Sequence, residues 1–191
     1  PGYSKEVQAI AFHPHQPLFV SGCADTNVRV WDLASGKQRW LCQGHTQSVS
    51  AVAISHAGTR VASSAIGDHV RIWEIPPSNS LLATADLASA PLRHLIPCPA
   101  QHIFALAFSP DDRLLAGSSE MGLYLWNVEN GEIVHPLPSQ TLGNVSLAFS
   151  ADGTLLASGS IDHTIGLWSV VSGELLHLLR NHHGTILSLI H

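Results

Sequence analysis

The sequence has little charge, few aromatic residues and no long apolar run. Charged residues make up 12% and aromatic residues 6% of the 191 residues. No segment approaches the ~18 consecutive apolar residues of a membrane-spanning helix. The nine Lys and Arg residues are scattered, and 14 Asp and Glu residues bring the net charge to -5. Neither a membrane nor a nucleic acid is therefore an expected partner.

Cysteine is also scarce. The three cysteines, Cys23, Cys42 and Cys98, include no Cys-x-x-Cys pair. Their odd number favours reduced thiols that pack as small hydrophobic side chains. Because reduced thiols are typical of the cytosol, we expect a cytoplasmic location, with the nucleus open to a eukaryotic protein.

Histidine is abundant, with 13 residues, but the sequence lacks a recognisable metal site. The nearest pairs, His13 with His15 and His182 with His183, have no Cys, Asp or Glu at a ligand spacing. Glycine-rich phosphate loops, nucleophile elbows and zinc-protease motifs are absent as well. We therefore expect no metal and no cofactor, and an enzyme is the weakest interpretation of the sequence.

A tryptophan recurs at the end of four short alternating segments, VRVW, VRIW, LYLW and IGLW. These residues are Trp31, Trp73, Trp126 and Trp168, which lie 42, 53 and 42 residues apart. Alternation of this kind is typical of a half-buried β-strand. The chain therefore contains an internal repeat.

Three further strands are expected in each repeat. The first strand ends at Phe12, Ile54, Phe108 and Phe149. A polar turn rich in Pro, Asp or Gly leads to the second strand, in LFVSG, RVASS, LLAGS and LLASG. A fourth strand, seen in QRWLC, EIVHP and ELLHLL, follows a turn whose glycine lies five residues after the tryptophan, at Gly36, Gly131 and Gly173.

Such four-stranded sheets are apolar on both faces, so they are expected to stack around an axis. We predict an all-β fold, a β-propeller of four four-stranded antiparallel blades that form an incomplete ring. The repeats are expected at 1–43, 44–98, 99–140 and 141–180. Residues 181–191 contain GTILSLI, the expected first strand of a fifth repeat. Further repeats of the same chain or a second copy would close the ring.

The repeats resemble those of the WD40 family, which carry a Gly-His pair and a Trp-Asp pair in units of about 40–45 residues. The best matches are Gly44 with His45 and Trp31 with Asp32. The later repeats depart from this pattern, with Trp-Glu, Trp-Asn and Trp-Ser in place of Trp-Asp. The resemblance implies a non-catalytic scaffold for protein–protein interactions. The alternative is a substrate- or peptide-recognition module, such as a ubiquitin-ligase adaptor or a chromatin-peptide reader.

The family also has a structural hydrogen-bond network of a His, a strand Ser or Thr, a turn Asp and the Trp. The matching residues are Ser21, Asp25 and Trp31, then His45, Ser63 and Trp73, then Ser158, Asp162 and Trp168, with His182 available to a fifth repeat. In the second repeat Gly67 takes the Asp position and Asp68 comes one residue late. The third repeat has Gly117 for Ser and Glu120 for Asp, so we expect these two repeats to be less regular.

Family members that bind phosphopeptides place arginines near the start of the innermost strand. The corresponding positions are Gln8, Ser50, Phe104 and, in the fourth repeat, Val145 or Ser146, of which we select Ser146. None of these residues is basic, so a phosphate clamp is not supported. They are the expected channel-mouth contacts of a protein or peptide partner. The second repeat has about eleven extra residues within 76–100, expected to hold its fourth strand and a long loop that is either a tolerated insertion or a binding element.

Overall fold

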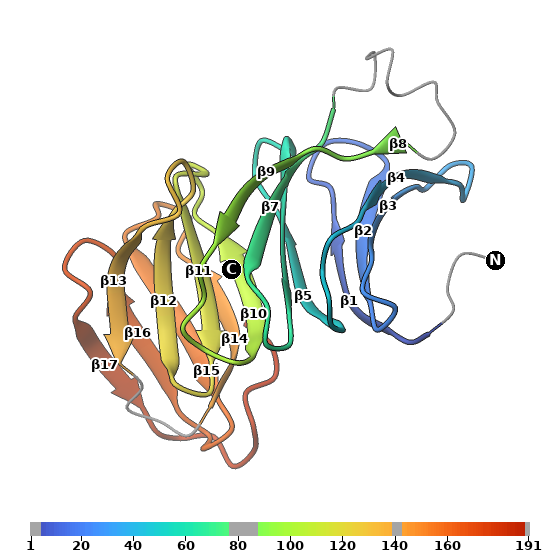
Figure 1. Cartoon of the computed structure of the whole chain (residues 1–191). Helices are drawn as coiled ribbons and strands as arrows, with labels where there is room; N and C mark the ends of the chain where they lie inside the picture. Colours follow the sequence, from blue (N-terminus) through green and yellow to red (C-terminus); the bar gives the residue numbers. More distant parts are fainter. Residues whose placement is uncertain (1–4, 77–87, 139–142, 190–191) are drawn as a thin grey trace. The chain divides into compact units, whose positions relative to one another are not determined.

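The computed structural model describes residues 5–76, 88–138 and 143–189, which form β-sheets without a helix (Figure 1). Sheet 1 contains β1 (Val7–Phe12), β2 (Leu18–Cys23), β3 (Val28–Asp32), β4 (Gln38–Cys42) and the short β8 (Ala88–Ser89). Sheet 2 contains β5 (Val49–Ile54), β6 (Arg60–Ala65), β7 (Val70–Glu74) and β9 (Leu92–Ile96). Sheet 3 contains β10 (Ile103–Phe108), β11 (Leu114–Ser119), β12 (Gly122–Asn127) and β13 (Ile133–Pro138). Sheet 4 contains β14 (Asn144–Phe149), β15 (Leu155–Ser160), β16 (Ile165–Ser169) and β17 (Leu175–Leu179).

The prediction of four repeats with four antiparallel strands each is confirmed. Tight turns join the strands, and the glycines expected after three of the tryptophans adopt positive φ values of 65°, 73° and 72° at Gly36, Gly131 and Gly173. In each of these turns the glycine N–H donates to the carbonyl of the residue that follows the tryptophan. A side chain at such a φ is strained, which explains why glycine recurs there.

The chain divides into two compact units, residues 1–99 and 100–191, and each unit contains two sheets. In the first unit, sheets 1 and 2 pack face to face around one apolar core. We call the face of a sheet that packs on the next sheet its forward face, and the opposite one its backward face. The forward face of sheet 1 supplies Leu18, Val20, Val28 and Val30 to the core, and the backward face of sheet 2 supplies Val52, Val61, Trp73 and Ile75.

The second unit repeats this arrangement. The forward face of sheet 3 supplies Ala116, Leu123, Leu125 and Leu137, and the backward face of sheet 4 supplies Phe149, Leu156, Trp168 and Val170. All eight side chains are buried. Sheets that are apolar on both faces are therefore stabilised by stacking, as the sequence predicted.

The extra residues of the second repeat form a strand that the sequence did not reveal. The expected fourth strand is β9, and residues 77–87 of the expected loop lie outside the described residues. Before β9 the chain passes along sheet 1, where β8 pairs in parallel with β4 (Figure 1). Sheet 1 thus has five strands, and the fifth comes from the second repeat.

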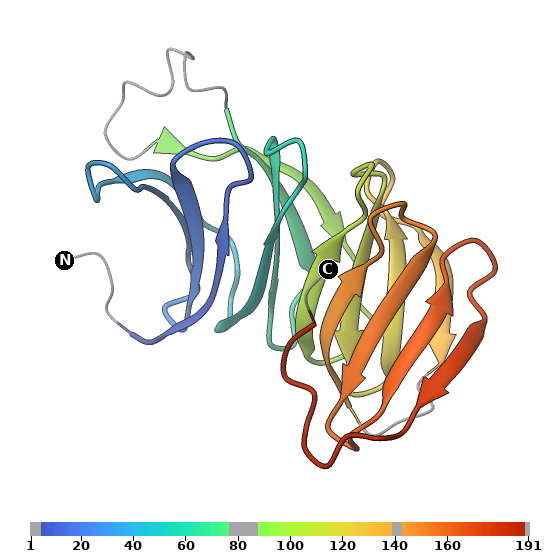
Figure 2. The same ribbon diagram turned by 180° about the vertical axis from the view of Figure 1, so that it is seen from behind.

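The segment expected to begin a fifth repeat differs from the prediction. Residues 181–189 form no strand, although Figure 2 shows the C-terminal trace running beside sheet 4. The N–H of Ile186 donates to the carbonyl of Ser160 at 3.2 Å, and the carbonyl of Ile186 accepts a bond from the Ser146 hydroxyl at 2.9 Å. A strand needs a neighbouring strand for a hydrogen-bond ladder, and in the described chain none flanks this segment.

Candidate functional site

A largely buried chain of hydrogen bonds joins five side chains from the strands and loops of sheet 2. The indole N–H of Trp73 donates to Ser63 Oγ at 2.8 Å, and Ser63 Oγ lies 2.7 Å from Nε2 of His45. On the other side of the imidazole ring, Nδ1 of His45 lies 3.1 Å from Oδ2 of Asp68. Arg71 completes the group, with Nη1 2.6 Å from the same carboxylate oxygen. The structure therefore brings the predicted His45, Ser63 and Trp73 together and adds an ion pair.

The imidazole of His45 is neutral near pH 7. Burial, opposed by the hydrogen bond to Asp68 and assisted by the charge of Arg71, lowers the pKa of His45 to about 4. With its proton on Nδ1, the ring donates to Asp68 and accepts the Ser63 hydroxyl proton at Nε2, so every donor from Trp73 to Asp68 meets an acceptor. Nη1 of Arg71 also lies 2.7 Å from Nδ1 of His45, so the guanidinium and the ring share one oxygen of Asp68.

Asp68 remains ionised in this network. Burial opposes its ionisation, but hydrogen bonds from Arg71 and from the N–H groups of His69 and Thr46 outweigh that effect and hold the pKa of Asp68 well below its usual range. The bonds to the carboxylate join the turn of residues 65–68 to the segment that enters β5. The network thus fixes two loops at the same end of sheet 2.

The expectation that the second repeat would be less regular at this network is wrong. Asp68 N–H donates to the carbonyl of Ala65, and Gly67, the third residue of this turn, has a φ of 66°, as in a type II turn. In sheet 1 the residue with a positive φ is Thr26, which comes directly after Asp25. In sheet 2 the residue with a positive φ, Gly67, comes directly before Asp68. Because the positive φ comes before the carboxylate residue in sheet 2, Asp68 reaches His45 although Asp68 lies one residue later than the family position.

Sheets 1 and 4 contain the Trp–Ser hydrogen bond of the sheet 2 network. Trp31 Nε1 donates to Ser21 Oγ at 2.8 Å, and Trp168 Nε1 donates to Ser158 Oγ at 3.0 Å. Asp25 is bound by both terminal nitrogens of Arg29, and these bonds, with the N–H of Asn27, outweigh burial and lower the pKa of Asp25 to about 2.

Asp162 of the fourth repeat and His182 after it are not joined in one network. Asp162 accepts hydrogen bonds from the N–H and hydroxyl of Thr164, which stabilises its turn. The His positions that precede sheets 1 and 4, at Tyr3 and Gln140, lie outside the described residues. His182 is exposed, and its expected partners would belong to a fifth repeat.

Sheet 3 has a different arrangement, as expected from Gly117 and Glu120. The indole of Trp126 covers Gly117 so closely that a Cβ at Gly117 would collide with the ring. Trp126 is fully buried, and its Nε1 has no hydrogen-bond partner within the described chain. Glu120 accepts the N–H of Gln101 at 2.9 Å, a contact similar to that between Asp68 and Thr46. This sheet keeps the loop contact but has lost the serine-centred network.

The strand positions selected as channel-mouth contacts have different environments. The sheet register aligns Gln8, Ser50 and Phe104, each the second residue of a first strand, with Val145. Ser146 is buried and is occupied by its bond to Ile186, so it is not equivalent to the other three. Gln8 is exposed, whereas Ser50, Phe104 and Val145 are half-buried.

The turns at the same end of the sheets carry exposed apolar side chains that the sequence analysis did not single out. The turns between the second and third strands of sheets 2, 3 and 4 expose Ile66, Met121 and Ile161 by 45%, 65% and 46%. Ile66 and Ile161 donate their N–H groups to main-chain carbonyls, and Met121 donates its N–H to Ser119 Oγ, so each residue is held in its turn while its side chain faces solvent.

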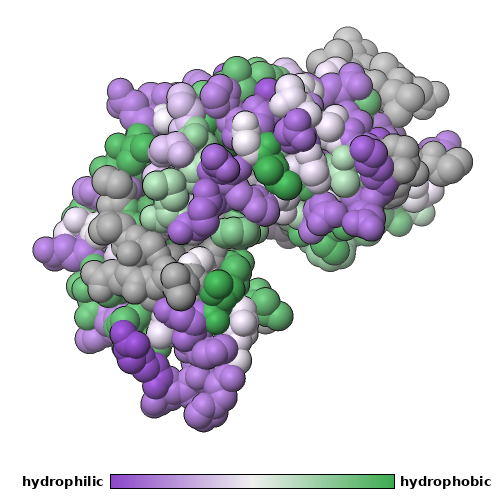
Figure 3. Space-filling model, turned by 60° about the horizontal axis from the view of Figure 1, so that its bottom comes forward, coloured by the Kyte–Doolittle hydropathy of each residue, from purple (hydrophilic) through white to green (hydrophobic). Residues whose placement is uncertain are grey.

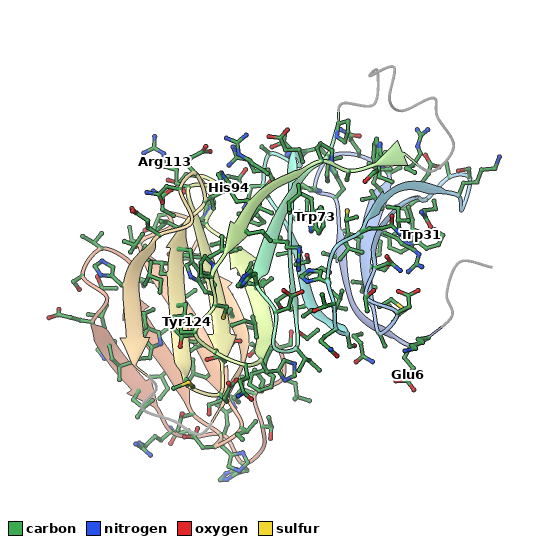
Figure 4. All side chains as sticks on the ribbon, viewed as in Figure 1. Glu6, Trp31, Trp73, His94, Arg113 and Tyr124 are labelled. Atoms are coloured by element: carbon green, nitrogen blue, oxygen red, sulfur yellow. The ribbon has the colours of Figure 1, made fainter. Side chains whose placement is uncertain are left out.

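The backward face of sheet 1 is open. Ile10, Phe12 and Leu33 are exposed by 59%, 64% and 49%, although their equivalents in sheet 2 are buried or half-buried. The rings of Phe12, Phe19 and Trp31 form a row with centroids 6.1 Å apart. Figure 4 shows Trp31 on this open side, whereas Trp73 points between sheets 1 and 2. Figure 3 shows other hydrophobic side chains exposed among polar ones.

The forward face of sheet 4 is open as well. It has a hollow of about 180 Å³ lined by Ala148, Phe149, Ser150, Leu155, Ala157, Leu167 and Leu189. Leu155, Ala157 and Leu167 are half-buried here, whereas their equivalents in sheet 1, Leu18, Val20 and Val30, are almost fully buried by sheet 2. The hollow therefore lies where another sheet would pack.

One contact on this open face matches a contact at a packed sheet interface, and one exposed side chain there is the equivalent of a side chain that makes such a contact. Ile186 lies against Gly159 as Val49 of sheet 2 lies against Gly22 of sheet 1. His135 of β13 lies with Nε2 3.0 Å from the carbonyl of Val171 in the next sheet. The equivalent of His135 in β17 is His177, which is exposed.

Among the described residues no group of three or more His, Cys, Asp or Glu side chains could hold a metal ion. His13, one of the closely spaced histidines, is instead buried between two turns. Its Nε2 lies 2.9 Å from the carbonyl of Gly58, and its Nδ1 accepts the N–H groups of His15 and Gln16. Burial is the main reason that the pKa of His13 is lowered. Among the described residues, no helix is long and apolar enough to cross a membrane.

Comparison with known proteins agrees with this architecture. The family model for the WD domain, G-beta repeat, matches residues 1–32, 36–74, 91–127 and 131–169. The chain therefore belongs to the WD40 family of β-propeller proteins, as its sequence indicated, and the family is one of protein-binding scaffolds.

Similar proteins include two named as ribosomal proteins. The chain is 30% identical over 173 residues to small ribosomal subunit protein RACK1y of Oryza sativa subsp. japonica. This match covers 86% of the chain and 48% of that protein. It is 31% identical over 176 residues to small ribosomal subunit protein RACK1 of Neurospora crassa, covering 86% and 51%. Protein tipD of Dictyostelium discoideum is 25% identical over 189 residues, covering 98% and 29%. The chain thus spans about half or less of the length of these relatives.

Proposed function

We propose that this chain is part of a larger WD40 propeller that acts as a non-catalytic scaffold for protein partners in the cytoplasm. The observation that carries the proposal is the pair of open apolar faces, the backward face of sheet 1 and the forward face of sheet 4. Faces of this composition are buried wherever two sheets pack within a unit. Leaving such large apolar areas in water is unfavourable, so a further sheet is expected on each.

The fifth sheet would begin with residues 181–191. Ile186 already lies on Gly159 in the way that Val49 lies on Gly22. A second copy would have to place its own β1 where Ile186 lies, which favours further repeats of the same polypeptide over a ring of two copies. His177 would then reach the next sheet as His135 reaches Val171, and His182 would join a network like that of His45.

In each of the two units, partner contacts are proposed at the end of the sheets where the first strands begin. Gln8, Ser50, Phe104 and Val145 are accessible there in different degrees. The turns with Ile66, Met121 and Ile161 add exposed apolar side chains. Uncharged polar and apolar groups of this kind suit a protein or peptide better than a phosphorylated ligand.

The ribosomal association in the relatives' names does not extend readily to this surface. Fourteen acidic residues exceed nine basic ones, and a surface that binds RNA phosphates needs clustered Lys and Arg. The second candidate is a substrate- or peptide-recognition module. It would use the same strand ends, and an adaptor segment elsewhere in the gene product would favour it over the scaffold.

The first experiment compares residues 1–191 with a version extended through the following repeats. We expect the short chain to bind a hydrophobic dye and to unfold with low cooperativity, and the extended chain to be a monomer with one sharp transition. Light scattering and calorimetry measure these properties. A cooperative dimer of residues 1–191 would contradict the proposal, because two copies would then close the ring.

The second experiment tests the partner surface. In the full-length protein, Ser50→Arg and Phe104→Ala should weaken binding of captured partners at least tenfold without changing the melting temperature. Val171→Ser, at an 82% exposed turn residue outside this surface, is the matched control. Equal binding by all three variants would place the partner surface elsewhere.

A further inference from the structure

The outer edge of sheet 1 carries an added strand. Residues Ala88 and Ser89 of β8 pair in parallel with Trp40 and Leu41 of β4, the fourth strand of that sheet. The N–H of Ala90 then donates to the carbonyl of Leu41 at 3.1 Å. Leu41 therefore directs its main-chain groups away from β3, toward the open edge, where an extended segment can bind them.

The four fourth strands differ in whether this edge position is available. The register with the third strand aligns Leu41 with Leu95 in β9, Pro136 in β13 and Leu178 in β17. Proline has no N–H, so β13 cannot donate at this position. In β9 the edge carries Arg93, whose guanidinium lies 2.6 Å from the carboxylate of Glu74, and charges of this kind discourage strand pairing.

The outer edge of β17 has none of these protections. Its sequence, LLHLL, contains no proline and no Asp, Glu, Lys or Arg. Leu176 and Leu179 are each exposed by 46%, and within the described part of the chain sheet 4 ends at β17. An apolar edge strand without proline is a site for pairing with a further strand.

We propose that β17 is a docking site for an extended, uncharged peptide segment of a partner, which adds to sheet 4 as a parallel strand. The N–H and carbonyl of Leu178 pair with the peptide as those of Leu41 pair with residues 88–90. The Ala-Ser-Ala sequence of residues 88–90 defines the peptide chemistry, namely small residues that approach the edge closely.

A second copy of the chain fits this edge less well. Two β17 strands related by a two-fold axis would pair antiparallel, whereas the strand already accepted by β4 is parallel. The edge is also separate from the forward face on which a fifth sheet would pack, because strand addition occurs in the plane of the sheet. Peptide docking at β17 therefore does not depend on the proposed ring.

The experiment uses the full-length protein and a synthetic peptide with blocked termini and the uncharged sequence of residues 87–92, LASAPL. Amide hydrogen exchange is measured at Leu178 and Leu41, and peptide affinity is measured by titration. We expect the peptide to slow exchange at Leu178 at least tenfold and to leave Leu41, already covered by β8, unchanged. N-methylation of the peptide at its Ser-Ala bond, the equivalent of the Ala90 N–H, should weaken binding about tenfold.

Leu178→Pro removes the outward N–H without removing a donor to β16, and it should also weaken binding about tenfold. Leu95→Pro at the equivalent position of β9 is the control and should bind the peptide as the wild type does. Unchanged affinity for the methylated peptide would overturn the proposal, because main-chain pairing would not be responsible. If amide exchange at Leu178 slowed as the protein concentration was raised without peptide, this result would also overturn the proposal and assign the edge to a second copy.

Discussion

Replacement of Ser63 with alanine tests how much the network of sheet 2 stabilises the fold. Ser63 Oγ accepts the indole N–H of Trp73 at 2.8 Å and lies 2.7 Å from His45 Nε2. All three side chains are buried. Alanine would leave an indole N–H and an imidazole nitrogen without partners and without access to water. Each orphaned group costs about 1–3 kcal/mol, so we expect the free energy of unfolding to fall by about 3 kcal/mol.

The matched control is Ser21→Ala in sheet 1. Ser21 accepts the indole N–H of Trp31 at the same distance, 2.8 Å, but Trp31 is only half-buried on the open face. Water can replace the lost partner there, so the expected loss is about 1 kcal/mol. Denaturant titrations followed by tryptophan fluorescence and circular dichroism measure both losses in the full-length protein. A loss for Ser63→Ala no larger than that for Ser21→Ala would refute the stabilising role of the buried network.

Three further predictions follow from single side chains. Between pH 6.5 and 4 the free energy of unfolding should fall by up to about 3 kcal/mol through His45, because the unfolded ring binds a proton near 6.5 and the folded ring only near 4; denaturation of His45→Gln should lack this part of the pH dependence. Gly58→Ala should lower the melting temperature more than Gly36→Ala, since both have positive φ but only the first would place a Cβ against His13; equal shifts would contradict this. Cys42, whose pKa burial raises to about 12, should resist iodoacetamide at pH 8 until the protein is unfolded, as mass spectrometry would show.

Most of the fold could be predicted because its signals are local. The alternation that ends at Trp31 and its three counterparts locates the third strands, and the turn glycines locate the connections. The strand β8 could not be predicted, because Ala88 and Ser89 have no strand-forming pattern of their own and pair with a strand more than 40 residues earlier. Pairing over such a distance depends on how the sheets pack, which a local pattern does not contain.

The candidate site shows the same division. The residue types of the network could be identified from their spacing, but spacing alone made Asp68 look misplaced, because the type of a turn decides where its third and fourth residues point. The choice between Val145 and Ser146 depended on strand register, and a shift by one residue moves a side chain to the opposite face. The open faces could be described only once the packed faces of equivalent sheets were known.

The origin of β8 has a consequence for how the gene can be divided. The strand lies in the second repeat of the sequence but completes the first sheet, and the chain returns to sheet 2 only at β9. The unit that repeats in the sequence is therefore not the unit that can be removed intact. Deleting residues 44–98 would uncover Trp40 and the edge of β4, whereas an exchange of repeats with junctions after residue 98 would preserve both. Recombination between paralogues should tolerate the second kind of junction more often than the first.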